Sequence, residues 1–348
     1  MSLSRRQQAR PVTCRPMLDL LLDGDRAVQG FILHVFEAST ARRHAIFLAL
    51  GPIAEAEDRE AAIEARGFPD LATLAQALVK RPTKILLTDL LGSLPDGLLG
   101  LFARLPQDPL PVDIYAQLHR VFEEDSRRAE TLRQLPGEVT LAKIEAVLSL
   151  ESVALHPDVV RYVFARHVAF EVNAIVRAAR RLSSRATDEC LALSIKCSRA
   201  HTRKLAEFWL KRIDRLPVAP PFVENDPEFR VLNGPEMLEA ARGYKNCLQT
   251  KLASVGAGLA VYAEVRSKQV IVELRPLTGG DWLATEIAGP NNAPISKGVL
   301  DEIKCLLAER GILALAPSPY EDGRVISRYA HFGFDDLLLP DGDEELAA

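Results

Sequence analysis

Cys247 is the residue whose type and setting first suggest chemistry. A cysteine thiol acts as a nucleophile when a base, most often histidine, lies within hydrogen-bond reach and a third group orients that base. The nearest histidines along the chain are His201 and His331, and the charge of Lys251 could favour the thiolate. We therefore name Cys247 as a candidate catalytic residue of a Cys-dependent hydrolase; the alternative is a buried structural cysteine.

A short turn of Gly, Pro and Asn at residues 289–292 comes just before a predicted helix. Backbone N–H groups at a helix N-terminus attract anions, and a pair of side-chain amides beside them could donate further hydrogen bonds to the anion. The candidate anion- or ligand-binding residues are therefore Gly289, Asn291, Asn292 and Ser296. The alternative is that the asparagines only shape the turn, because Asn tolerates left-handed backbone geometry.

Three glutamates, Glu264, Glu273 and Glu286, fall on three predicted strands. Paired carboxylates can bind Mg²⁺ or act as acid and base, whereas an outward polar row on a half-solvated sheet is the alternative. Strand register decides whether they meet. The chain carries no HExxH, GxSxG, Walker or Rossmann signature, and we predict neither a bound metal nor a cofactor.

Six basic residues on two predicted helices form the candidate nucleic-acid-binding set. Residues 161–215 contain thirteen Lys and Arg against five Asp and Glu, although the whole chain has a net charge of −4. Such cations can contact phosphates, and without exposed aromatic residues between them we expect backbone contact rather than base stacking. The alternative is a solvated charged face. The set is Arg166, Arg177, Arg180, Lys196, Arg199 and Arg203.

Two long helices are expected to position these cations. Apolar residues recur every three or four positions over residues 160–182 and again over 187–213, which predicts a pair of antiparallel helices. Cys190 and Cys197 flank the second apolar stripe and are expected to be small core residues. Upstream, Pro and Gly separate short helices such as residues 70–80, and residues 29–36 could be a strand instead.

The remaining candidates lie in a segment that predicts a small sheet between helices. A helix that carries Cys247 begins at residue 234, strands follow at residues 259–265, 270–274 and 282–288, and Ser296 can cap a helix that runs to residue 310. One more strand is predicted over residues 312–316. The predicted fold class is α+β, a mostly helical N-terminal region followed by a small antiparallel sheet flanked by helices.

Composition divides the chain into five predicted parts. These are a basic leader over residues 1–16, a helical domain over 17–213, a Pro-rich linker over 214–233, an α+β module over 234–334 and an acidic tail over 335–348. The leader and the tail are expected to be disordered. Five scattered cysteines without a CxxC pair favour a reducing cytoplasm, and no apolar run is long enough to predict a membrane partner.

Residues 234–311 resemble the PcfJ-like family, whose members are encoded mainly on conjugative plasmids, phages and other mobile elements. The matching positions are residues 246–248, Gly258, the two strands over 261–265 and 270–274, and residues 289–292. The resemblance implies a role as an accessory protein of a mobile genetic element. Together with the basic helices, it leads us to expect a cytoplasmic protein that binds nucleic acid or a partner protein.

Residues 259–334 also resemble the second half of a GNAT acetyltransferase, a family that often ends in Tyr-x-x-x-Gly-Phe. Here that ending begins at Tyr329. The resemblance implies an acyl-CoA-dependent acyltransferase in which backbone N–H groups hold the pyrophosphate of the acyl-CoA and Tyr329 protonates the leaving thiolate. An enzyme built on residues 234–334 is therefore the alternative to a binding protein.

Overall fold

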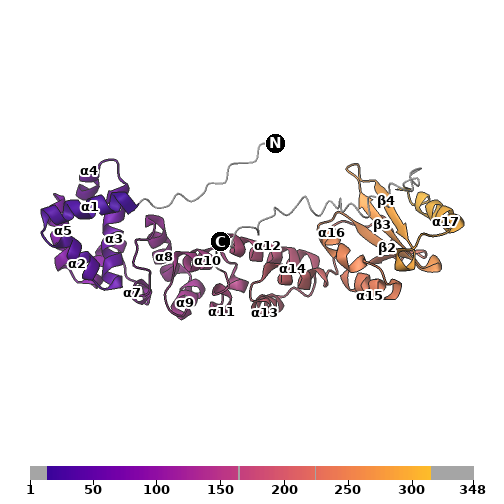
Figure 1. Cartoon of the computed structure of the whole chain (residues 1–348), viewed down its shortest axis with the longest axis horizontal. Helices are drawn as coiled ribbons and strands as arrows, with labels where there is room; N and C mark the ends of the chain where they lie inside the picture. Colours follow the sequence, from indigo (N-terminus) through magenta and orange to yellow (C-terminus); the bar gives the residue numbers. More distant parts are fainter. Residues whose placement is uncertain (1–13, 164, 224, 315–348) are drawn as a thin grey trace, which may run out of the picture. The chain divides into compact units, whose positions relative to one another are not determined.

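The computed structural model describes residues 14–163, 165–223 and 225–314, which form two compact units (Figure 1). The first unit ends at Trp209 and the second begins at Leu210. Among the described residues the first unit is helical, and the second combines one five-stranded sheet with helices. The fold class is therefore α+β, as predicted. None of the described helices has the length and apolar character needed to cross a bilayer.

The first ten helices of the helical unit follow the Pro and Gly breaks of the sequence. Helix α5 shows how they are specified, because Oδ1 of Asp70 accepts a hydrogen bond from the Thr73 N–H at 2.7 Å, and Leu74 and Leu78 are buried. The strand considered for residues 29–36 is wrong, since helix α2 occupies most of that range. The helices are α1 (Cys14–Ala27), α2 (Phe31–Glu37), α3 (Thr40–Glu55), α4 (Arg59–Glu64), α5 (Leu71–Lys80), α6 (Thr83–Leu91), α7 (Leu98–Phe102), α8 (Val112–Glu124), α9 (Ser126–Gln134) and α10 (Leu141–Ser149).

Each of the two long helices predicted for the basic region is divided in the structure. The first becomes α11 (Pro157–Val160) and α12 (Arg166–Leu182), and the second becomes α13 (Asp188–Ser198) and α14 (Thr202–Leu210). The apolar face predicted for the first is nevertheless buried, as Val168, Val172 and Ala179 show. Periodicity therefore indicated which side faces the core but not where each helix ends.

The break between α13 and α14 occurs at two residues with left-handed backbone, Arg199 (φ 54°) and Ala200 (φ 55°). Neither glycine nor proline marks this break, so the sequence offered no signal. Packing supplies the reason, because Ala200 is buried and Trp209 Nε1 donates a hydrogen bond to Ser194 Oγ at 3.1 Å. This turn folds α14 back onto α13. Cys190 and Cys197 are both exposed, so the prediction that they are core residues is wrong.

The second unit is built on a sheet in which strands β1 to β5 are neighbours in chain order. Strands β1 to β4 pair antiparallel, whereas β5 runs parallel to β4, so the sheet is mixed rather than wholly antiparallel. The elements of this unit are β1 (Phe229–Leu232), α15 (Gly234–Tyr244), α16 (Leu252–Gly256), β2 (Val261–Val265), β3 (Val270–Pro276), β4 (Trp282–Ala288), α17 (Lys297–Ala308) and β5 (Ile312–Ala314).

The two faces of the sheet carry different helices. One face, which includes Val272, packs with α17 through Ile303 and Leu307. The opposite face packs with α15 and α16 and includes Tyr262 and Ile271. Because side chains alternate along a strand, the neighbour of Ile271 and Val272 in sequence, Glu273, points to the α15 and α16 side. The candidate site lies on this side of the sheet.

The segment predicted as a linker, residues 214–233, folds as part of the second unit. It contains β1, and its Phe222 stacks on Phe229 with ring centroids 4.5 Å apart. Its two ends meet, because the Gly234 N–H donates to the Ile213 carbonyl at 2.8 Å. A Cβ at position 234 would lie 2.9 Å from the carbonyl oxygen of Leu210, so this approach needs glycine. The segment is therefore a closed loop that returns to the sheet.

Candidate functional site

The sequence predicted that Cys247 lies within a helix, but the structure places it in a turn. Helix α15 ends at Tyr244, and Lys245 then takes left-handed backbone geometry with φ of 50°. The side chain of Asn246 holds the next turn, because its Oδ1 accepts a hydrogen bond from the Leu248 N–H at 3.1 Å. The thiol of Cys247 is exposed, so the alternative of a buried structural cysteine is wrong.

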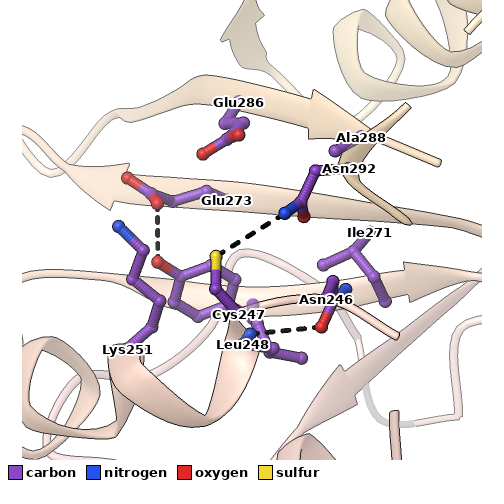
Figure 2. Close-up of a pocket in the computed structure, with 10 residues that line it drawn as sticks. Asn246, Cys247, Leu248, Lys251, Ile271, Glu273, Glu286, Ala288 and Asn292 are labelled. Atoms are coloured by element: carbon purple, nitrogen blue, oxygen red, sulfur yellow. Dashed lines mark hydrogen bonds between the residues drawn. The ribbon is translucent and has the colours of Figure 1, made fainter. Parts of the chain in front are cut away.

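Asn292 is the closest polar neighbour of this thiol that the described contacts show. Its Nδ2 donates to the sulfur of Cys247 at 3.8 Å, within range of a weak hydrogen bond to sulfur (Figure 2). Asn292 ends the short 3₁₀-helix η4 (Pro290–Asn292), and it has left-handed backbone geometry with φ of 56°. The Gly289 N–H donates to the carbonyl of Ala293 at 3.0 Å and closes this turn.

Glu273 forms the buried floor beside the thiol. Its side chain is 4% exposed and accepts hydrogen bonds from Tyr262 Oη at 2.5 Å, Arg275 Nε at 2.8 Å and Thr285 Oγ1 at 2.9 Å. Burial opposes its charge, but these three donors outweigh burial and lower the pKa of Glu273 below its usual value. Burial and the adjacent carboxylate both raise the pKa of Tyr262. The carboxylate is therefore held ionised.

A β-bulge brings a second carboxylate to the same place. The register between β3 and β4 shifts at Glu273, so that Glu286 is its direct partner and Thr285 is the extra residue of the bulge. Glu286 is exposed, and Figure 2 shows it above Glu273 on the neighbouring strand. The side chain of Lys251 points toward the carboxylate of Glu273 from the opposite side in the same view. The site thus combines a thiol, an amide, an ammonium group and two carboxylates.

The hollow between these groups is small, with a volume of about 30 Å³. A water molecule needs roughly 10–15 Å³ of such space, so the hollow holds about one or two waters. The pocket therefore fits one small polar group, such as the end of a side chain or the carbonyl of a substrate that lies across the surface. Its lining comes from residues near α15, from β2 to β4 and from η4.

The structure brings together some of the predicted site residues and separates others. Cys247, Asn292, Glu273 and Glu286 line one pocket, although the sequence analysis had treated them as three independent groups. Glu264 is elsewhere, because it accepts a hydrogen bond from the Tyr244 hydroxyl at 2.8 Å.

Gly289, Asn291 and Ser296 do not line this pocket. Ser296 stands directly before α17, but its side chain makes no capping hydrogen bond. Of the two amides predicted to hold an anion, Asn292 faces the thiol, and anion binding at residues 289–296 stays a prediction. Tyr262 and Thr285, whose hydroxyls hold Glu273, were not among the predicted site residues. Alternation from Ala260 places Tyr262 on the α15 side, whereas Thr285 is the extra residue of the bulge, so alternation does not give its side.

The described residues of the second unit contain no histidine, so none of them forms a Cys–His pair with Cys247. The nearest upstream histidine, His201, belongs to the helical unit, whereas His331 and Tyr329 lie outside the described residues. Over the described part of the chain, no group of three or more His, Cys, Asp and Glu side chains is arranged to hold a metal ion. Within the pocket, Glu273, Glu286 and Lys251 are groups beside Cys247 that can carry or accept a proton.

The first pair of predicted phosphate contacts is held in an ion-pair network on the helical unit. Arg177 Nη1 lies 3.1 Å from Oε1 of Glu151, and Arg180 Nη1 lies 2.9 Å from Oε2 of the same residue. Arg180 also pairs with Asp188 at 2.7 Å, and this hydrogen bond raises the pKa of Arg180. Two carboxylates thus offset these two cations and weaken the local positive field.

A second pair of predicted contacts is also matched by acids. Lys196 Nζ lies 3.3 Å from Asp158, and Arg203 Nε lies 3.0 Å from Glu207. Both pairs are at the surface, where such interactions contribute only about 0–1 kcal/mol. A phosphate group can therefore compete with either carboxylate at small cost.

Arg166 and Arg199 differ from the other four because each lies over an aromatic ring. The guanidinium of Arg166 is 5.3 Å from the ring centre of Phe170, and that of Arg199 is 5.9 Å from Tyr162. Phe170 is 50% exposed, so the prediction that no exposed aromatic residue accompanies these arginines is wrong. A flat cation beside an exposed ring is a surface on which a nucleic-acid base can stack.

An open groove of about 480 Å³ lies beside Arg199 in the helical unit. Arg161, His201 and Lys204 also line it, together with Thr202 in the first turn of α14. Among the described residues no acidic side chain pairs with Arg199 or Lys204. This groove thus brings two cations that lack a carboxylate partner in the described part of the chain, Arg199 and Lys204, to the same place as Arg161.

Comparison with protein-family models, with curated proteins and with solved structures yields no match to this chain. The pocket at Cys247 and the groove at Arg199 are therefore the two places on the chain that bear on its function.

Proposed function

We propose that the protein is a cytoplasmic accessory protein of a mobile genetic element that binds the phosphate backbone of nucleic acid in the groove at Arg199. The observation that supports this most is the groove itself, which is lined by Arg161, Arg199 and Lys204. Only Arg161 of these has an acid nearby, at 3.8 Å from Asp158. A polyanion is the partner that such a cluster recognises.

The first turn of α14 adds to this attraction. The N–H groups of a helix's first turn lack helical partners and carry a partial positive charge. Thr202, the first residue of α14, lines the groove, and the left-handed turn at Arg199 and Ala200 exposes this helix end. Backbone donors and cationic side chains thus converge on one place, as a phosphate requires.

The predicted cations outside the groove are expected to make weaker phosphate contacts where they are already paired with acids. Arg177 and Arg180 share Glu151, so their contribution to phosphate binding is expected to be small. Arg166, which lies over the exposed ring of Phe170, is expected to contribute both charge and stacking. Arg166 and Arg199 are therefore the two members of the predicted set that we propose as main contacts.

The assignment to a mobile genetic element rests on the PcfJ-like resemblance of residues 234–311. The segments that carry this resemblance, residues 246–248 and 289–292, contact each other through Cys247 and Asn292, which supports reading them as one site. Four cysteines of the described residues are free and exposed, which suits the reducing cytoplasm that we propose.

A titration of the full chain with labelled single- and double-stranded DNA and RNA, at low and near-physiological salt, tests this function. The double variant R199Q/K204Q should weaken binding about tenfold or more at low salt and reduce the salt dependence, because each lost phosphate contact removes released counterions. The control R26Q/K84Q also removes two exposed cations but leaves the groove intact. Equal losses in both variants, or salt-independent binding, would contradict the proposal.

Thiol chemistry at Cys247 is the second candidate function, favoured by the exposed sulfur beside Asn292 and Glu273. In a hydrolase, the amide of Asn292 could donate to the developing oxyanion, and the pocket would receive the substrate carbonyl. A screen with activated esters and peptides tests it, with C247S as the inactive variant and C305S as the matched control. Equal turnover by C247S and the parent protein would exclude it. The acyl-CoA-dependent alternative depends on Tyr329, outside the described residues, and stays a prediction.

A further inference from the structure

A hollow of about 680 Å³ lies where α3, α4, α5 and α6 meet in the helical unit. Its walls are mostly apolar and come from side chains such as Ala49, Ala62, Leu74 and Leu86. Small-molecule sites in proteins are typically apolar hollows of roughly 300–1,000 Å³ with a few placed polar groups. This hollow therefore has the size and the lining of a ligand site.

Two arginines line the hollow, and they differ in how their charge is compensated. Arg81 pairs with Asp89 at 2.8 Å and lies over the ring of Phe68 at 5.6 Å. Arg66, just beyond the end of α4, has no carboxylate within ion-pair distance among the described residues. Burial lowers the pKa of its guanidinium. One wall thus offers a partly desolvated cation that lacks an anion.

From this charge and shape we propose that the hollow binds a small amphiphile with one anionic head group, such as a carboxylate, and an apolar chain. The head group would pair with Arg66, and the chain would lie against the alanines and leucines of α3 to α6. A partly buried guanidinium gains most from a carboxylate, because two N–H donors match its two oxygens. The proposal is independent of nucleic-acid binding, since the groove at Arg199 shares no residue with this hollow.

The test is isothermal titration calorimetry of the full chain with two probes of equal chain length and opposite charge, decanoate and decylammonium, both below their micelle concentrations. Decanoate should bind, and decylammonium should bind at least about tenfold more weakly because of repulsion by Arg66. The variant R66Q should weaken decanoate binding about tenfold, the effect expected when a hydrogen-bonded charge partner is lost. The matched control R26Q removes an exposed arginine outside the hollow and should bind decanoate like the parent protein.

A second variant tests the apolar part of the site, in case R66Q changes the affinity for decanoate only slightly. Ala77 lines the hollow and is only partly buried, so A77L places three extra carbons in the empty space without altering the core. This variant should lose decanoate binding while its charge is unchanged. Absence of decanoate binding to the parent protein, equal affinity for both probes, or full affinity in both R66Q and A77L would each overturn the proposal.

Discussion

The amide of Asn292 lies 3.8 Å from the sulfur of Cys247, although the two residues are 45 positions apart in sequence. The turn that ends at Asn292 and the turn that follows α15 are thereby joined at the surface of the sheet. Glu273 lies beneath them and supplies a buried negative charge.

Native alkylation should reach Cys247. Because its thiol is exposed, iodoacetamide should modify it in the folded protein, as it should modify the exposed Cys305. Mass spectrometry of the tryptic peptides measures this, with complete labelling in urea as the reference. Modification of Cys247 only after unfolding, while Cys305 reacts in the native state, would show that the turn after α15 is closed.

Removing the charge of Glu273 should destabilise the second unit. In E273Q, one of the two carboxylate oxygens becomes an NH2 donor, so either Tyr262 or the pair Arg275 and Thr285 loses its buried acceptor. The expected loss is about 2 kcal/mol in the free energy of unfolding. Urea denaturation measures it. The control E286Q changes the exposed partner on β4 and should stay within about 0.5 kcal/mol of the parent protein. Equal stability of the two variants would mean that the buried carboxylate contributes nothing.

Arg310 should be needed to hold the closed loop over residues 214–233. Its Nε lies 2.8 Å from Oδ2 of Asp226, whose side chain is 4% exposed, and its guanidinium is 4.8 Å from the ring centre of Phe229. The variant R310Q leaves the Asp226 carboxylate buried with only backbone donors, which should cost about 2–3 kcal/mol in unfolding free energy. R266Q, at an exposed arginine of the same unit, is the control. Urea denaturation with no difference between them would restore the view of this segment as a linker.

His44 should make the helical unit sensitive to mild acid. It is fully buried, with Nδ1 2.7 Å from the Tyr115 hydroxyl and Nε2 2.6 Å from the Pro106 carbonyl oxygen. Burial, aided by the charge of Arg43, lowers the pKa of His44 below its usual 6.5. Just below pH 6.5, His44 binds a proton in the unfolded chain but stays neutral in the folded chain. The unfolding free energy should therefore fall as pH drops from about 6.5.

Denaturant titrations between pH 7.5 and pH 5 measure this slope. The variant H156Q, at an exposed histidine of the same unit, should retain it. An H44Q variant, where the amide can donate to Pro106 and accept from Tyr115, should have lower stability at pH 7.5 but a shallower slope. Identical slopes for the parent protein and H44Q would assign the acid sensitivity to other groups.

Much of the local structure was predictable, because its signals are local. The N-cap Asp70 and the apolar spacing after it specify α5, the alternation of residues 261–265 specifies β2, and Gly311 follows the end of α17. Each of these depends on residues within a few positions of one another. Cys247 and Asn292 were likewise named as candidates from their own surroundings.

What the sequence by itself determined is therefore the set of elements, the faces that they bury and the residue types available for chemistry. Only the tertiary structure decided that Asn292 meets Cys247, that the bulge on β4 sets Glu286 opposite Glu273, and that Glu264 pairs with Tyr244 instead. Strand register and the choice of charge partners depend on groups far apart in the chain. The free energies of alternative registers and charge pairs differ only when the sheet and its helices are packed together, so no local sequence pattern encodes the choice.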